Sequence, residues 1–149
     1  MPVTYAEVYA VLSPEEPDYA KAAQLGAEAL PHLEAMIGGK DVMLASKAAY
    51  AAGLVGGERA TALLRQAAGH REAALRVAAA SAVARLPSAR AAPILEALLS
   101  DRDLGVRKVA LRSIPADAPA SLRRKVAEIA AQSSPLQQIS AEVLGKLKP

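Results

Sequence analysis

The stretch that decides the fold is Asp103–Ile114, DLGVRKVALRSI. It opens with a residue that favours a helix N-cap, and its apolar side chains then recur at helical spacing. The apolar residue that anchors this pattern returns at intervals of 31, 31 and 30 residues, at Leu44, Leu75, Val106 and Leu136. A fixed period of roughly 20–50 residues is the signature of a stacked repeat protein.

A second apolar set precedes each anchor and keeps the same period, at Leu33, Leu64, Leu95 and Val126. Apolar residues also stand three and four positions after each of these, so each segment forms a helix with one buried stripe. Only a few residues, such as 38–40 and 69–71, separate the two helices of each unit, and short links favour antiparallel neighbours. The sequence therefore predicts stacked helical hairpins, with Leu64, Val83, Leu95 and Val106 buried between them.

The predicted domain organisation is a single domain over residues 1–149. Residues 1–26 do not follow the period and are interpreted as a helical N-terminal cap, in which Thr4 and Glu7 form a capping box and Asp18 caps a second helix. The four repeats are expected at residues 27–57, 58–87, 88–117 and 118–149.

Capping residues and prolines predict where individual helices begin. The second helix of each hairpin is expected to open at Asp41, Glu72, Asp103 and Ser133. Pro31 and Pro93 occupy the same place in their units, and proline is tolerated in the first turn of a helix. Both prolines are therefore predicted to lie close to a helix start.

Composition supports an all-α protein. The chain contains 36 alanines among 149 residues, and it has no Phe, Trp or Cys. Alanine is the best helix former, and aromatic residues that favour strands are scarce. The absence of Cys excludes disulfides and thiolate metal sites. No apolar run is long enough to span a membrane, so a cytoplasmic protein without a membrane partner is expected.

Charge is distributed unevenly along the chain. Residues 1–57 contain three lysines, no arginine and seven acidic residues, whereas residues 58–149 contain fifteen Lys or Arg and eight acidic residues. Such asymmetry can steer an acidic partner toward the basic part, although a solvated surface is the more common reason for it.

The repeat units resemble HEAT-like repeats of the type found in phycobilisome lyase subunits. The resemblance rests on the pattern Ala-x-Pro-x-Leu-x-x-Leu-Leu at 91–99 and on Asp103-x-x-Val-Arg-x-x-Ala110, and it covers about residues 27–147. It implies a right-handed α-α superhelix of four hairpins with the second helices on the concave side. It also implies ion pairs between repeats, carried here by Arg76 and Arg107 only, because Ala45 and Gln137 replace the arginine in the outer units.

Arg76 and Arg107 admit two interpretations. Each follows an acidic residue by four positions, Glu72 and Asp103 respectively, which is one helical turn. Pairing with these acids is the structural interpretation that we favour, and an anion site is the alternative.

No residue pattern indicates catalysis. His32 and His70 are the only histidines, and neither has another ligand at metal-binding spacing. No nucleophile motif or phosphate-binding loop is present. We therefore predict no catalytic residue, no cofactor and no metal, and a non-enzymatic role; a bilin-lyase-like subunit is an alternative that only the resemblance implies.

The outward positions of the second helices form the candidate binding surface. We expect a strip that is apolar at its middle and basic further along, and its candidate partner-binding residues are Tyr50, Val77, Ser81, Arg107, Lys108 and Arg112. Tyr and Arg often carry binding energy at interfaces, although Tyr50 could instead cover a neighbouring helix. The favoured function is binding of a protein partner with an acidic patch.

Nucleic-acid backbone binding is the alternative function. It depends on the basic stretch Arg102–Lys125, because phosphate binding needs only clustered cations. No aromatic residue follows Tyr50, so bases cannot stack in the basic part of the chain.

Overall fold

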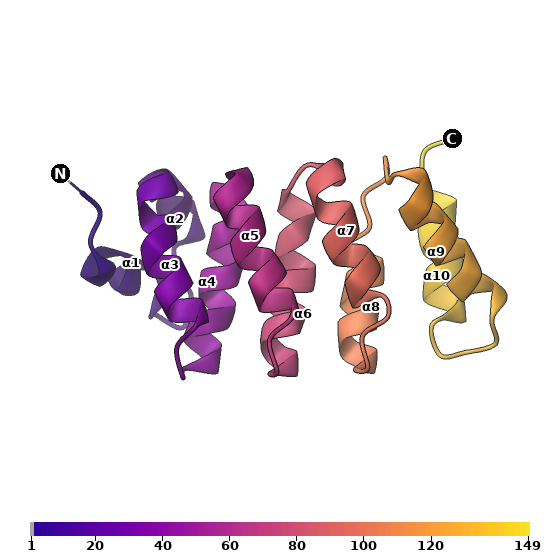
Figure 1. The fold of residues 1–149 in the computed structure, drawn as a ribbon, viewed down its shortest axis with the longest axis horizontal. Helices are drawn as coiled ribbons and strands as arrows, with labels where there is room; N and C mark the ends of the chain where they lie inside the picture. Colours follow the sequence, from indigo (N-terminus) through magenta and orange to yellow (C-terminus); the bar gives the residue numbers. More distant parts are fainter. Residues whose placement is uncertain (1) are drawn as a thin grey trace.

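The computed structural model describes residues 2–149 as a row of helices along one long axis, with the two termini at opposite ends (Figure 1). The N-terminal cap consists of α1 (Tyr5–Leu12), α2 (Tyr19–Leu25) and the 3-10 segment η1 (Gly26–Ala29). Four hairpins follow: α3 (Leu30–Ile37) with α4 (Val42–Val55), α5 (Gly57–Ala68) with α6 (Ala73–Ala82), α7 (Ser88–Leu98) with α8 (Leu104–Arg112), and α9 (Ala120–Ala131) with α10 (Gln137–Lys146). A second 3-10 segment, η2 (Val83–Arg85), extends α6. The predicted all-α arrangement of a cap and four hairpins is confirmed.

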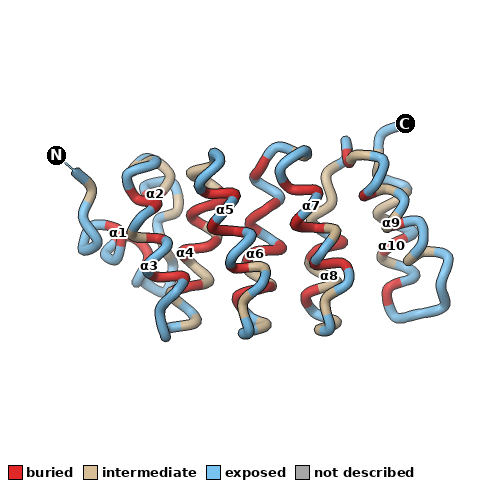
Figure 2. The backbone as a smooth tube through the Cα atoms, viewed as in Figure 1, coloured by how far each residue is buried: buried red, intermediate tan, exposed pale blue. Residues whose placement is uncertain are grey.

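The helices form two layers. The first helices of the hairpins, α3, α5, α7 and α9, lie in front in Figure 1, and the second helices lie behind them. Buried residues concentrate along the row, between and within these layers (Figure 2). Leu64, Val83, Leu95 and Val106 have no exposed surface, as the register predicts. The 31-residue period therefore describes the packing.

Small residues let successive second helices approach closely. A Cβ atom added at Gly53 in α4 would lie 2.6 Å from the carbonyl oxygen of Ala82 in α6, closer than real Cβ contacts allow. Only glycine fits at this position without a backbone shift. The chain therefore has a tight contact between its first two hairpins.

Most of the predicted caps are present. The Thr4 hydroxyl accepts from the Glu7 amide and completes the capping box, and the carboxylates of Asp18, Asp41 and Asp103 each accept from an amide three residues on. Glu72 occupies the N-cap position of α6, but its side chain makes no capping hydrogen bond.

The predicted start of the last helix at Ser133 is wrong, because α10 begins only at Gln137. Pro135 disfavours the helical conformation at the residue before it, Ser134. The Ser134 hydroxyl instead accepts a hydrogen bond from the Leu136 amide at 3.2 Å, so the segment forms a turn before the helix starts.

The two equivalent prolines have different surroundings. Pro31 lies in the first turn of α3, as predicted, because the preceding residues form η1. Pro93 lies inside α7, which already begins at Ser88, so the prediction for this helix start is wrong. The carbonyl that loses its helical partner is that of Ala89, an exposed residue, where water can take the place of the missing amide.

The second helices differ in length, and that of the third hairpin is the shortest of the four. The helix α4 has 14 residues, whereas α8 has 9 and ends at Arg112. Pro115 follows three residues later and opposes the helical conformation of Ile114. The third hairpin therefore lacks the last turn that the first hairpin has.

Candidate functional site

A shallow hollow of about 320 Å³ lies on the layer of second helices. Three successive elements of that layer contribute to it: α4, the C-terminal part of α6 with η2, and α8 with the residue after it. Its lining residues are Tyr50, Ser81, Ala84, Arg85, Val109, Arg112 and Ser113. The hollow therefore joins three hairpins on one face and carries two arginines and one aromatic ring.

Tyr50 is held in place by its neighbours. Arg85 donates from Nη2 to the Tyr50 hydroxyl at 2.9 Å, and its guanidinium carbon lies 5.8 Å from the centre of the Tyr50 ring. On its other side the ring meets Tyr19 edge-on, with ring centres 4.7 Å apart. Burial, together with the nearby Tyr50, raises the pKa of Tyr19 above its ordinary value. Tyr50 is half-buried and its ring packs against α2, which agrees with the alternative interpretation that it covers a neighbouring helix.

The structure brings together only part of the predicted strip. Tyr50, Ser81 and Arg112 line the same hollow, and the remaining three residues, Val77, Arg107 and Lys108, are half-buried and do not line it. Sequence reasoning missed Arg85. Its repeat equivalents, 31 residues before and after, are Leu54 and Ala116, so the period gave no signal of a functional arginine there.

Arg76 joins two adjacent hairpins, but not through Glu72. Its Nε donates to Asp101 Oδ2 at 2.9 Å and its Nη2 to Asp101 Oδ1 at 3.2 Å, while Nη1 donates to the carbonyl oxygens of His70 and Arg71. The side chain is almost fully buried and reaches from α6 to the loop of the next hairpin. The prediction that Arg76 pairs with an acidic side chain is confirmed, but the acid is Asp101 and not Glu72, so the predicted partner is wrong.

Asp101 remains charged within this contact. Burial raises the pKa of its carboxyl, but the hydrogen bond from Arg76, the amide of Asp103 and the charges of Arg76 and Arg102 outweigh that effect. The net result is a pKa below the ordinary Asp value. A bidentate Arg–carboxylate pair is geometrically specific. It therefore fixes the position of the loop that contains Asp101 relative to the loop that contains His70 and Arg71.

Arg107, the repeat equivalent of Arg76, has no such partner. Its Nε is buried and has no hydrogen-bond acceptor among residues 2–149. The predicted pairing with Asp103 is wrong: among the described residues no ion pair joins the two side chains, and the Asp103 carboxylate accepts from the Val106 amide and caps α8. Counted at the 31-residue spacing of the first helices, the position equivalent to Asp101 in the next hairpin is Gln132, which is exposed. Among the described residues, the ladder of ion pairs therefore consists of one step, Arg76 with Asp101.

The basic stretch does not form one continuous surface. Arg123 donates from Nε to the carbonyl oxygen of Ala118 at 2.7 Å, and from Nη2 to that of Ala116 at 3.3 Å, so it braces the linker between α8 and α9. Arg124 is exposed but belongs to α9, in the layer opposite Arg112 of α8. The cations that are free to bind a phosphate backbone are thus divided between the two layers.

Both histidines have structural contacts. His32 Nε2 lies 2.8 Å from the carbonyl oxygen of Val3, and His70 Nδ1 accepts from the Glu72 amide at 3.0 Å. In the part of the chain that the structure describes, no three His, Asp or Glu side chains gather closely enough to hold a metal ion. The described helices are also each too short or too polar to cross a bilayer.

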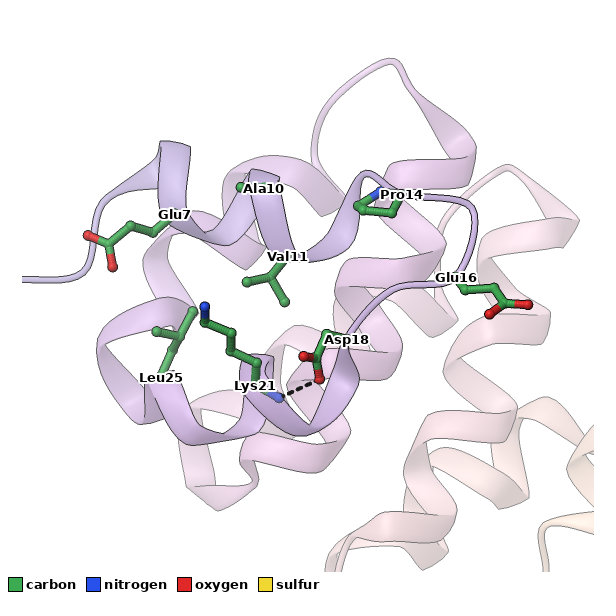
Figure 3. A pocket seen from close by; sticks show the side chains of 8 residues that line it. All are labelled: Glu7, Ala10, Val11, Pro14, Glu16, Asp18, Lys21 and Leu25. Carbon is green, nitrogen blue, oxygen red and sulfur yellow. Dashed lines mark hydrogen bonds between the residues drawn. The ribbon is translucent and has the colours of Figure 1, made fainter.

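A separate hollow of about 380 Å³ lies in the N-terminal cap, between α1 and α2 (Figure 3). Val11 and Leu25 form apolar walls, and the side chain of Lys21 extends into the space between them. Asp18 borders the hollow, but its carboxylate is already bound to the Lys21 amide at 3.0 Å. Sequence reasoning did not single out this hollow.

Comparisons with known proteins agree with this architecture. A chain in the complex of CpcE and CpcF of phycocyanin lyase from Nostoc sp. PCC7120 superposes with a TM-score of 0.73, covering 95% of this chain and 96% of that chain at 20% sequence identity. No curated protein matches the sequence. The sequence model of HEAT repeats matches residues 30–115, more than half of the chain. The resemblance inferred from the repeat pattern is confirmed, and the chain belongs to the HEAT-repeat family.

Proposed function

We propose that this HEAT-repeat chain is a non-enzymatic scaffold that binds a protein partner through the hollow on its second-helix layer. The observation that carries the proposal is the convergence of Tyr50, Arg85 and Arg112, from three successive hairpins, on one hollow. Aromatic and arginine side chains held in a fixed position lose little conformational entropy on binding, and such residues carry most of the energy at interfaces.

The charge of the hollow supports an acidic partner. Its lining includes two arginines and no acidic side chain. Arg112 is exposed, so it can meet a carboxylate on the partner directly. The hydrogen bond between Arg85 and the Tyr50 hydroxyl keeps the second guanidinium beside the ring in the free protein. A partner surface with clustered carboxylates is the complementary chemistry.

Parallel affinity capture from the source organism tests the proposal, with the wild-type chain and an Arg85→Glu, Arg112→Glu variant as baits. Proteins recovered by the wild type should be lost by the variant, as quantified by mass spectrometry. An Arg124→Glu, Lys125→Glu variant carries the same charge change on α9 and should keep them. Equal recovery by all three baits would refute the proposed surface.

Duplex DNA binding separates the alternative function from this one. A backbone-binding protein should lose affinity steeply with salt, with a log–log slope of about −0.9 per neutralised phosphate. We expect only weak duplex binding at physiological salt, because Arg123 is engaged with the linker and the free cations are divided between two layers. Tight binding that survives Tyr50→Ala but not the reversal of Lys108 and Arg112 would favour nucleic acid instead.

A further inference from the structure

An apolar cleft of about 390 Å³ lies between α8 and α10, beside the hollow of the proposed function. The walls come from the last turn of α8, the linker after it and one face of α10. The lining residues are Leu111, Arg112, Ile114, Ala116, Ile139, Glu142, Val143, Lys146 and Leu147. Arg112 lines both the hollow and the cleft, so the two form one continuous surface.

The cleft exists because α8 is short. In the first hairpin the second helix continues to Val55, whose counterpart two repeats later is Asp117. Pro115 prevents the same continuation in the third hairpin, where the helix ends at Arg112. About one helical turn that could pack against α10 is therefore missing.

The missing turn leaves apolar surface on α10 partly uncovered. Ile139 and Val143 are four residues apart and therefore lie on one face of α10. Leu147, the residue that ends the helix, lines the same cleft. All three are only half-buried, whereas Leu136 and Ser140 near the same helix are buried. The apolar floor of the cleft can therefore gain burial from another molecule.

The rim of the cleft is mainly cationic. Arg112 and Lys146 are exposed at the last turns of α8 and α10. One carboxylate, that of Glu142, also lines the cleft, and it accepts from the side-chain amide nitrogen of Gln138 at 3.4 Å. The rim therefore carries more positive than negative charge. A ligand that combines an apolar group with negative charge is complementary to such a cleft.

We propose that the α8–α10 cleft receives an apolar side chain of the protein partner, and that carboxylates within one helical turn of it on the partner pair with Arg112 and Lys146. This inference rests on the proposed function, and it extends the binding surface from Tyr50 to Leu147. The partner segment takes the place of the helical turn that Pro115 removes.

Selection from a phage-displayed library of random dodecapeptides against the full chain tests the inference. Enriched peptides should combine Leu, Ile or Phe with Asp or Glu three or four positions away. In fluorescence anisotropy, Lys146→Glu should weaken the binding of these peptides by about fivefold, because attraction becomes repulsion at an exposed site. Glu142→Lys should strengthen it, and the control Arg124→Glu should change it by less than about twofold.

A second variant tests the apolar part. Val143→Thr keeps the shape of the side chain but adds a hydroxyl to the floor of the cleft, so peptide affinity should fall while the circular dichroism spectrum stays unchanged. Failure to enrich any peptide, enrichment of peptides without acidic residues, or insensitivity to Lys146→Glu would each overturn the inference. Self-association that Lys146→Glu abolishes would assign the cleft to a second copy and overturn it as well. Peptide binding lost in Arg85→Glu but kept in Lys146→Glu would overturn the cleft and leave the proposed function standing.

Discussion

The junction between the second and third hairpins and the junction between the third and fourth are equivalent in the repeat but differ in how they are held. At the former, Arg76 binds Asp101 through two hydrogen bonds and also binds two loop carbonyl groups. At the latter, Arg107 has the same register, but its Nε has no acceptor among the described residues and Gln132 replaces the acid. A repeat whose period is nearly constant can thus contain one locked and one loosely held junction, and the presence or absence of an acidic loop residue is one difference between them.

Removing the acid from the locked junction should have the largest effect. Asp101→Ala leaves the guanidinium of Arg76 buried without its carboxylate, so the free energy of unfolding should fall by about 3–5 kcal/mol. Urea titration followed by circular dichroism measures the change. The matched control is Gln132→Ala at the equivalent position of the loose junction, which should change stability by less than about 0.5 kcal/mol. Equal effects of the two variants would show that the junctions do not differ.

Truncating a core side chain should also destabilise the third hairpin more than the fourth. Leu95 has no exposed surface in the third hairpin, so Leu95→Ala should cost about 2–5 kcal/mol through the cavity that it leaves. In the fourth hairpin Ile129 is half-buried, and Ile129→Ala should cost less. Thermal melting of both variants provides the measurement. Unchanged melting of Leu95→Ala would show that the 31-residue register is wrong.

The pH dependence should isolate the ion pair within the locked junction. The pKa of Asp101 is lower in the folded chain than in the unfolded chain, where Asp titrates near about 3.9. The pair therefore stabilises the fold above that pH, and its contribution is lost as pH falls through the lowered folded value. Urea titrations across acidic pH should show the difference between wild type and Asp101→Asn shrinking. A difference that stays constant into strong acid would contradict this assignment.

Supplying an acid to the loose junction should have the smallest effect. Gln132→Asp places a carboxylate at the position equivalent to Asp101 and should raise the free energy of unfolding by about 0.5–1 kcal/mol. Repeating the substitution in an Arg107→Gln background completes a double-mutant cycle and should remove the gain. A gain that persists in that background would mean that Arg107 is not the residue being paired.

The period of the sequence was sufficient to predict the fold, because each buried position recurs where the helices stack. Leu33, Leu64, Leu95 and Val126 are all essentially buried, as the register requires. Local chemistry also predicted Asp41 and Asp103 as N-caps, because capping depends on an amide only three residues away.

The candidate site was less predictable, because long side chains choose partners across hairpins. Arg76 passes over Glu72, one turn away, and reaches a carboxylate 25 residues later in the next loop. Arg85 reaches Tyr50, 35 residues earlier. Helical spacing describes neighbours on one helix only, so neither contact could be derived from it.

We expect the contacts that hold the last hairpin to determine where the molecule bends. At one end of the third–fourth junction, the Lys148 amide donates to the carbonyl oxygen of Ala116 at 2.8 Å, beside the covalent linker. The loops that Arg76 and Asp101 join at the preceding junction lie at the other end of the helices (Figure 1), and within residues 2–149 the last junction has no such ion pair there. A hairpin that is held at only one end can rotate about that end. We therefore expect the compliance of the superhelix to be concentrated at one axis near residue 116, with the first three hairpins moving as a stiffer unit.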